Sequence, residues 1–154
     1  MCDLLFLMLN FRYTHHMKQQ KTVLVFGTFD GLHDGHRFFL AHARRLGNRL
    51  IASVATDEVV AGLKNHAPRY HLEERLKTLE ASGLVDLAVA GDSTIGNWSA
   101  VRVWKPDIVA VGYDQTNLAE ELREFIKNEH LPIEIVAIKP HEPNRLHSHL
   151  LTEK

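Results

Sequence analysis

The chain has 154 residues, of which 45% are hydrophobic and 24% charged, and its formal net charge is −1. These values are typical of a single soluble globular domain. A charge so close to zero excludes the broad basic surface that nucleic-acid binding requires, so no nucleic-acid partner is expected. The one cysteine, Cys2, excludes an internal disulfide and a thiolate metal cluster. Such sparse use of cysteine suits a cytoplasmic protein.

The N-terminal stretch, residues 1–16, has the pattern of an extension. Its apolar part is shorter than the roughly 20 residues that span a bilayer, so no membrane partner is expected. It also lacks the basic start and small-residue cleavage site of a secretory signal. Met17 begins a segment that leads directly into an apolar run. We therefore expect residues 1–16 to be a dispensable extension, with a docked N-terminal segment as the alternative, and residues 17–154 to form a single domain.

From residue 22 onward, signals typical of strands and helices alternate. Short apolar runs predict strands, and apolar residues three and four apart predict helices. In chain order the expected elements are strand 22–27, helix 36–48 stopped by Gly47, strand 49–55, helix 71–82, strand 85–91, helix 97–104, strand 107–112, helix 117–130, strand 133–138 and a short helix near Ser148. Residues 61–70 are expected to form a mobile loop.

This alternation predicts an α/β fold, with a Rossmann-like parallel five-stranded sheet and helices on both faces. The strands are nearly continuous apolar runs, as burial on both faces requires. In such sheets ligands bind beyond the carboxyl ends of the strands, near the point where the strand order reverses. The segments that fall at such ends are 27–36, 55–66 and 112–117.

The first of these segments, GTFDGLHDGH at 27–36, places two histidines at the start of an expected helix. Free backbone N–H groups at a helix start attract anions, and His33 and His36 would add side-chain donors. Zinc would require three or four ligands, and no motif nearby in the sequence supplies the remaining ones, so no metal ligand is assigned. A purely structural turn would leave both histidines without a reason. The segment therefore favours a phosphate-binding site.

The same stretch resembles the G-T-F-D-x-x-H-x-G-H signature of the nucleotidyltransferase, or cytidylyltransferase-like, superfamily, and the resemblance covers residues 22–151. It implies the HxGH nucleotidyltransferase fold and transfer of a nucleotidyl group from ATP or CTP to a phosphorylated acceptor, with release of pyrophosphate. Mg²⁺ is expected to accompany the triphosphate, and the resemblance allows a homodimer. Catalysis would then rest on positioning and charge stabilisation, without a nucleophilic triad.

The resemblance also implies roles for individual residues. His33 and His36 would hold the triphosphate and stabilise the transition state. Lys64 would reach the phosphates, with a solvated surface lysine as the alternative, and Arg75 would either contact phosphate or pair with glutamates on its helix. Asp30 would orient the turn. The nucleotide-binding residues expected in this first segment are Gly27, Thr28, Phe29, Asp30, His33, Asp34, Gly35 and His36.

Two later segments extend the expected site. PDIVAVGYDQ, residues 106–115, resembles P-D-I-I-A-L-G-Y-D-Q of archaeal-type FAD synthases, whereas glycerol-3-phosphate cytidylyltransferases tend to carry G-D-D-W there. Gly112, Asp114 and Gln115 would bind the nucleotide, with a turn-capping aspartate as the alternative for Asp114.

The second segment, RLHSHLL at residues 145–151, lines up with R-T-S-S-S-I-I of the same superfamily, so that Arg145 and Ser148 would contact phosphates. His147 and His149 depart from that pattern.

The sequence thus predicts a nucleotidyltransferase, with adenylyl transfer to FMN narrowly preferred. The alternative within the superfamily is cytidylyl transfer to glycerol 3-phosphate or another small phosphorylated alcohol. Two alternatives of other classes stay open at this point, which are a non-catalytic nucleotide-binding module and a zinc hydrolase.

Overall fold

The computed structural model describes residues 20–141. The expectations for the extension at 1–16, for Arg145 and Ser148, and for a last helix near Ser148 therefore lie outside the described residues. Within residues 20–141, no helix combines the length and the apolarity that crossing a membrane would require.

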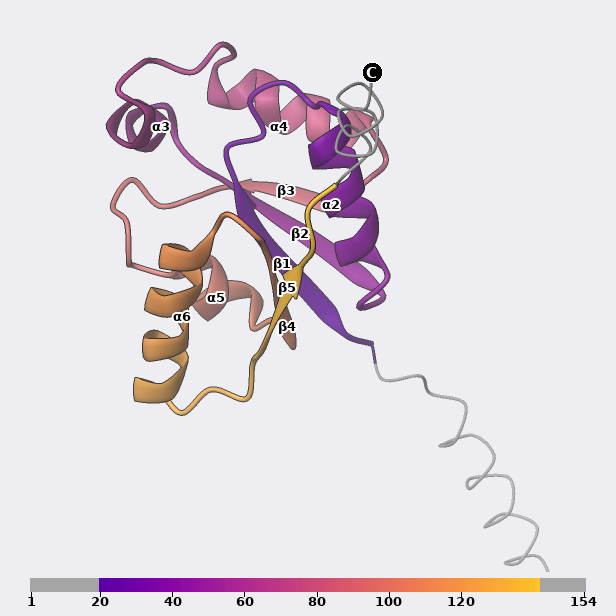
Figure 1. Cartoon of the computed structure of the whole chain (residues 1–154), viewed down its shortest axis with the longest axis vertical. Coiled ribbons are helices and arrows are strands. Elements are labelled where there is room, and N and C mark those ends of the chain that lie inside the picture. Colours follow the sequence, from indigo (N-terminus) through magenta and orange to yellow (C-terminus); the bar gives the residue numbers. More distant parts are fainter. Residues whose placement is uncertain (1–19, 142–154) are drawn as a thin grey trace, which may run out of the picture.

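The described chain alternates strands with helices in one parallel sheet (Figure 1). Each neighbouring pair of strands runs parallel, and the strand order is β3-β2-β1-β4-β5. The prediction of a five-stranded parallel Rossmann-like sheet is confirmed. The elements are β1 (Thr22–Gly27), α2 (Asp34–Arg44), β2 (Arg49–Val54), α3 (Asp57–Lys64), α4 (Leu72–Ala81), β3 (Leu87–Ala90), α5 (Ser99–Trp104), β4 (Ile108–Gly112), α6 (Thr116–Asn128) and β5 (Glu134–Ile138).

Helices cover both faces of the sheet. Successive side chains of a strand point to opposite faces, so Val23 and Val25 of β1 pack with α2 and α4, whereas Leu24 packs with α5 and α6. In Figure 1 these two pairs of helices flank the strands on opposite sides. Because both faces are buried, the central strands must be apolar along their whole length, as their sequences are.

The strand order reverses between β1 and β4, and this places the crevice of the sheet. The chain passes from β1 outward to β2 and β3, then crosses to the other side of β1 to form β4 and β5. Pairing between β1 and β4 stops at Val25 and Ala110, although both strands continue beyond these residues. The carboxyl ends of β1 and β4 therefore separate and leave a crevice between them, which is where ligands bind in sheets of this kind.

Two local expectations were wrong. Helix α2 ends at Arg44, not near residue 48. Gly47 does not stop it; a Cβ there would lie 2.5 Å from the Lys21 carbonyl oxygen, so the glycine permits a close approach to the start of β1.

The second wrong expectation is the mobile loop at 61–70, because its first half is helical and belongs to α3. The Thr56 hydroxyl accepts from the Val59 N–H and caps this short helix. Only Val60 of α3 is buried, so no apolar periodicity marked it.

Candidate active site

The turn between β1 and α2 carries the two histidines. Phe29 adopts a φ of +48°, which is uncommon for a bulky residue, and its ring is 3% exposed in the core. Burial of the ring therefore holds the turn in a conformation that the backbone alone disfavours. Such strain is typical of functional sites, and here it delivers the chain to the start of α2 beside the crevice.

The structure brings His33 and His36 together. Their rings stack with centroids 3.7 Å apart and planes inclined by 19°. His33 is the N-cap of α2, and its Nδ1 accepts from the His36 backbone N–H at 3.3 Å. The Nδ1 of His36 lies 3.1 Å from the Gly31 carbonyl oxygen. A Cβ on Gly35 would lie 3.0 Å from Cε1 of His33, so any other residue there would displace the ring from the helix start by a few tenths of an ångström.

These contacts fix the hydrogens of the two rings. The Gly31 carbonyl can only accept, so Nδ1 of His36 carries a hydrogen and Nε2 of the neutral ring has a lone pair. Nδ1 of His33 accepts, so its hydrogen is on Nε2, which can donate to a phosphate. Burial, and then the neighbouring His33, lowers the pKa of His36. The free site therefore offers one imidazole donor, and a second only after His36 is protonated.

Asp30 ties the turn to the segment that precedes α4. Its carboxylate accepts from the backbone N–H groups of Arg69 at 2.7 Å and Tyr70 at 2.9 Å. Burial would raise the pKa of Asp30, but these two hydrogen bonds and the charges of Arg75 and Lys64 outweigh it and lower the pKa. The carboxylate therefore stays ionised and orients the turn, as expected, while its oxygens are committed to the protein.

Arg75 does not pair with glutamates on its helix, which was one of the two roles considered for it from the sequence. Its side chain is wholly buried and pairs with Asp57, and contact with phosphate stays a prediction. The guanidinium donates to the carbonyl oxygens of Thr28 at 2.8 Å, Ala55 at 2.7 Å and Tyr70 at 3.0 Å, and to Asp57 at 2.6 Å. It therefore joins the ends of β1 and β2 to the segment before α4.

His71 completes this network from the surface. Its Nδ1 lies 3.1 Å from Asp57, and it caps α4 together with Glu74. Hydrogen bonds from His71, first, and from Arg75 lower the pKa of Asp57, and Asp57 in turn raises the pKa of His71. The contacts of Asp57 with His71 and Arg75 could not be found from local sequence patterns, because they join positions 14 and 18 residues apart in the chain.

Lys64 and Thr28 lie at the same edge of the sheet. Nζ of Lys64, at the end of α3, is 3.5 Å from the Thr28 hydroxyl, which is the long limit of a hydrogen bond. Lys64 is exposed, and its positive charge lowers the pKa of both His36 and Asp30. The structure thus places this lysine at the site, and its contact with phosphate stays a prediction.

The turn after β4 forms the other wall of the crevice. The Gln115 amide donates through Nε2 to the Phe26 carbonyl at 2.9 Å and accepts through Oε1 from the Gly112 N–H at 2.8 Å. The Gln115 N–H also donates to the Gly112 carbonyl. Asp114, in the same turn, is exposed, and its negative charge acts to raise the pKa of His36. Gln115 therefore frames the site, and direct contact with a nucleotide stays a prediction.

Asp34 begins α2 and is exposed. A carboxylate there complements the helix N-terminus but would oppose a polyanion, so any nucleotide contact falls to its backbone N–H. Across residues 20–141, no three His, Cys, Asp or Glu side chains gather as a metal site.

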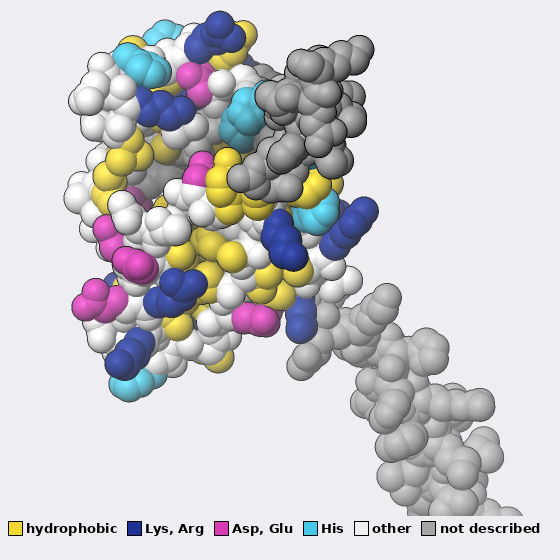
Figure 2. Space-filling view, viewed as in Figure 1, with side chains coloured by type: hydrophobic (Ala, Val, Ile, Leu, Met, Phe, Trp, Pro, Cys, Tyr) yellow, Lys and Arg dark blue, Asp and Glu magenta, His cyan; other side chains and the backbone are white. Residues whose placement is uncertain are grey.

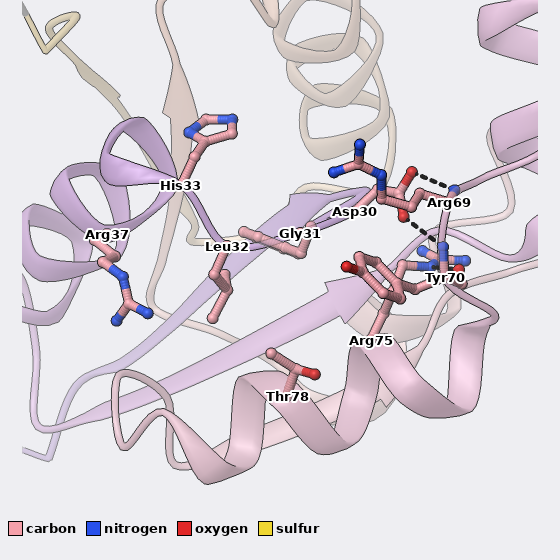
Figure 3. A pocket seen from close by; sticks show the side chains of 10 residues that line it. Asp30, Gly31, Leu32, His33, Arg37, Arg69, Tyr70, Arg75 and Thr78 are labelled. Atoms are coloured by element: carbon pink, nitrogen blue, oxygen red, sulfur yellow. Dashed lines mark hydrogen bonds between the residues drawn. The ribbon is translucent and has the colours of Figure 1, made fainter.

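A cleft of about 570 Å³ adjoins the turn (Figure 3). It lies between the turn at 29–33, Arg37 of α2, the segment Arg69–Tyr70 and Thr78 of α4. In Figure 2, lysine, arginine and histidine side chains lie over α3 and α4 at the upper end of the molecule, and others are interspersed with acidic side chains lower down. The positive groups next to the turn itself include Arg37 and Arg69, which line the cleft.

Fold and site together define an α/β protein of the Rossmann-like, nucleotide-binding class, with its candidate site at the switch point of the sheet. The sequence model of the cytidylyltransferase-like family matches residues 24–153. The chain therefore belongs to this family, and the predicted nucleotidyltransferase superfamily is confirmed.

Similar proteins include archaeal FAD synthases. The one from Methanosarcina barkeri is 41% identical over 118 residues, which cover 75% of this chain and 81% of the relative. That from Thermococcus sibiricus is 35% identical over 121 residues, covering 79% and 82%. Among solved structures, a lipopolysaccharide core biosynthesis protein from Thermoplasma volcanium superposes with a TM-score of 0.73 at 31% identity, covering 79% of this chain and 98% of that one.

Proposed function

We propose that the protein transfers the adenylyl group of ATP to FMN, forming FAD and releasing pyrophosphate. The stacked pair of His33 and His36 at the switch point carries the proposal for nucleotidyl transfer. Relatives named FAD synthase, which align with most of this chain, support FMN as the acceptor. The Gly112–Gln115 turn, whose sequence matches that of archaeal-type FAD synthases, supports ATP as the donor.

The chemistry requires little beyond placement and charge. A phosphate oxygen of FMN attacks the α-phosphorus of ATP, and the bond from that phosphorus to the bridging oxygen of the β-phosphate breaks. The FMN phosphate is largely ionised at neutral pH, since its second pKa is about 6, so no general base has to remove a proton. The protein therefore contributes by aligning the two reactants and stabilising negative charge as it develops.

The two histidines supply donors for that charge. Nε2–H of His33 is available in the neutral ring, and Nε2 of His36 becomes a donor when the triphosphate raises its proton affinity. Lys64 adds a positive charge from the other side of Thr28. Backbone N–H groups at the start of α2 complete the set, because the first N–H groups of a helix lack partners within the helix.

Mg²⁺ bound to the triphosphate fits the side chains present. The ion usually takes one or two carboxylates together with substrate phosphate oxygens. Asp114 is the exposed carboxylate near His36, whereas Asp30 is engaged with the backbone. Asp114 is therefore the residue that would hold the ion, which would neutralise part of the triphosphate charge.

The test is a product assay with ATP or CTP, each combined with FMN, glycerol 3-phosphate or another small phosphorylated alcohol. We expect FAD and pyrophosphate from ATP with FMN alone. Formation of a cytidine diphosphate alcohol would replace the proposed reaction with cytidylyl transfer. Tight nucleotide binding without pyrophosphate from any pair would indicate a non-catalytic nucleotide-binding module.

A further inference from the structure

The cleft beside the turn has the size and walls of a small-molecule site. Its volume of about 570 Å³ lies within the range of 300–1,000 Å³ typical of such sites. Figure 3 shows the Tyr70 ring on one side of the cleft and Leu32 on the other, with Thr78 facing them from α4, and His33 at the far edge with its ring turned away from these three side chains. A ligand that spans this cleft would have one end at the histidine and the other against an aromatic ring.

We propose that this cleft binds the isoalloxazine ring of the acceptor FMN, with the ring stacked on Tyr70 and the phosphate directed toward His33. The assignment rests on the proposed function, because it concerns the acceptor of that reaction.

The side chains of the cleft match the chemistry of a flavin. Tyr70 is 43% exposed, which is high for a large aromatic side chain and offers a face for stacking. Leu32 supplies an apolar contact for the dimethylbenzene end of the ring. Arg37 and Arg69 supply N–H donors for the carbonyl oxygens of its pyrimidine edge. The cleft thus combines an aromatic face and an apolar contact with polar groups that would orient the ring.

Tyr70 is held in place more firmly than an incidental surface residue. Its N–H donates to Asp30 at 2.9 Å, and its carbonyl oxygen accepts from Nε of Arg75 at 3.0 Å. Asp30 belongs to the histidine turn, and Arg75 also holds the Thr28 carbonyl of that turn. The backbone of Tyr70 is therefore tied to the reaction centre on both sides, as a pre-organised stacking platform would be.

The strand order places the cleft on the side opposite the nucleotide wall. β1 has β2 on one side and β4 on the other. The segment with Tyr70 and Thr78 lies between β2 and β3 in the chain, whereas Asp114 follows β4. In nucleotidyl transfer the attacking and leaving oxygens lie roughly in line across the phosphorus. A nucleotide bound near Asp114 therefore requires its acceptor to approach from the flank where the cleft lies.

The test uses the full-length protein and the fluorescence of FMN, which is quenched when the flavin stacks on a tyrosine. We expect wild-type protein to quench FMN, and Tyr70→Ala to lose the quenching and raise the Kd and KM for FMN about tenfold, with the KM for ATP unchanged. Tyr70→Phe should restore affinity, because it keeps the aromatic face. Val103→Ala, which truncates an exposed residue of α5, should behave as wild type.

A second variant guards against local unfolding. Thr78→Trp fills the cleft from the exposed surface of α4 and should abolish FMN binding while ATP binding and the thermal unfolding temperature are retained. An unchanged affinity for FMN in both Tyr70→Ala and Thr78→Trp would overturn the assignment and leave adenylyl transfer standing. A wild-type protein that quenches FMN but forms no FAD would instead overturn the proposed function and keep the cleft as a flavin site.

Discussion

The side-chain amide of Gln115 donates to the Phe26 carbonyl oxygen across 2.9 Å, and this contact joins β4 to β1 beyond the point where their pairing ends. The same amide accepts from the Gly112 N–H. The Gln115 side chain thus links the two strands where the backbone hydrogen bonds between them have ended. It holds the turn with Asp114 at a fixed place relative to the histidine pair.

Replacing Gln115 with glutamate tests this bridge, because the shape is kept and the donor is lost. A carboxylate would then face the Phe26 carbonyl oxygen, which also can only accept. Leaving such a group unsatisfied costs about 1–3 kcal/mol. We expect the KM for ATP to rise and kcat to fall, with a smaller effect on the KM for FMN, in steady-state kinetics. Equal kinetics for the variant and the wild type would show that the bridge does not position the site.

His36→Ala should lower kcat far more than it weakens ATP binding. The ring would contribute a donor mainly to charge that develops in the transition state, and one such donor is worth about 2.7–4 kcal/mol. The measurement is kcat together with the Kd for ATP. His42→Ala is the matched control, since His42 lies on the same helix, and its ring is hydrogen-bonded to the Phe38 carbonyl and packs on the Phe38 ring. A His36→Ala enzyme with full turnover would remove the histidine from the proposed mechanism.

ATP binding should be accompanied by proton uptake. Burial, with the stacked His33 and the charge of Lys64, lowers the pKa of His36 below 6.5, whereas the Gly31 carbonyl and Asp114 act in the opposite direction. The ring is therefore neutral above pH 7, and the triphosphate favours its charged form. Affinity for ATP should increase as pH falls from 8.5 to 7, by up to about tenfold per unit for one proton. Calorimetry in buffers of different ionisation enthalpy would count the protons, and His36→Gln should remove the dependence.

The same shift affects stability with a defined sign. Between the lowered pKa of folded His36 and 6.5, the unfolded chain binds more protons than the folded one. The free energy of unfolding contributed by His36 therefore falls as pH falls through that window. Urea unfolding of wild type and His36→Gln from pH 7.5 to 5 should show this slope in the wild type alone.

Arg75→Met should destabilise the fold by several kcal/mol, because each buried acceptor left without its donor costs about 1–3 kcal/mol. The change would leave Asp57 without its guanidinium and three carbonyl oxygens without a donor. Arg102→Met is the matched control, because Arg102 is exposed and its nitrogen lies 3.7 Å from Glu129, an arrangement worth at most about 1 kcal/mol. Urea unfolding measures both, and equal losses would contradict the buried network.

Much of the fold could be predicted because strands buried on both faces are continuous apolar runs. β1 (Thr22–Gly27) was predicted to the residue, and the histidine pair was placed correctly at its end. The short helix α3 escaped detection since it buries only Val60, although Thr56 followed by Asp57 and Glu58 is a typical helix start.

The remaining parts of the site depend on contacts between distant positions. Arg75 holds Thr28, which lies 47 residues away, and Gln115 holds Phe26, which lies 89 residues away. Local patterns carry no record of such pairs. The sequence could therefore supply the histidines of the turn, whose contact with phosphate stays a prediction, but not the residues that hold the turn in place. It also could not show that Tyr70 borders a cleft.

Asp30→Asn is expected to loosen Tyr70 without removing any apolar contact. The amide oxygen of the variant can still accept from one of the two backbone N–H groups. Its NH₂ group would face the other backbone N–H, which is also a donor, so about 1–3 kcal/mol of stability should be lost. Burial raises the pKa of Asp30, but the bonds from Arg69 and Tyr70 lower it by more, so its folded value lies below 3.8. The stabilisation is thus present above pH 3.8 and is lost as pH falls through the folded pKa. Urea unfolding should separate wild type from the variant at pH 7 and bring them together near pH 2, while a constant difference at both pH values would show that the carboxylate charge plays no part.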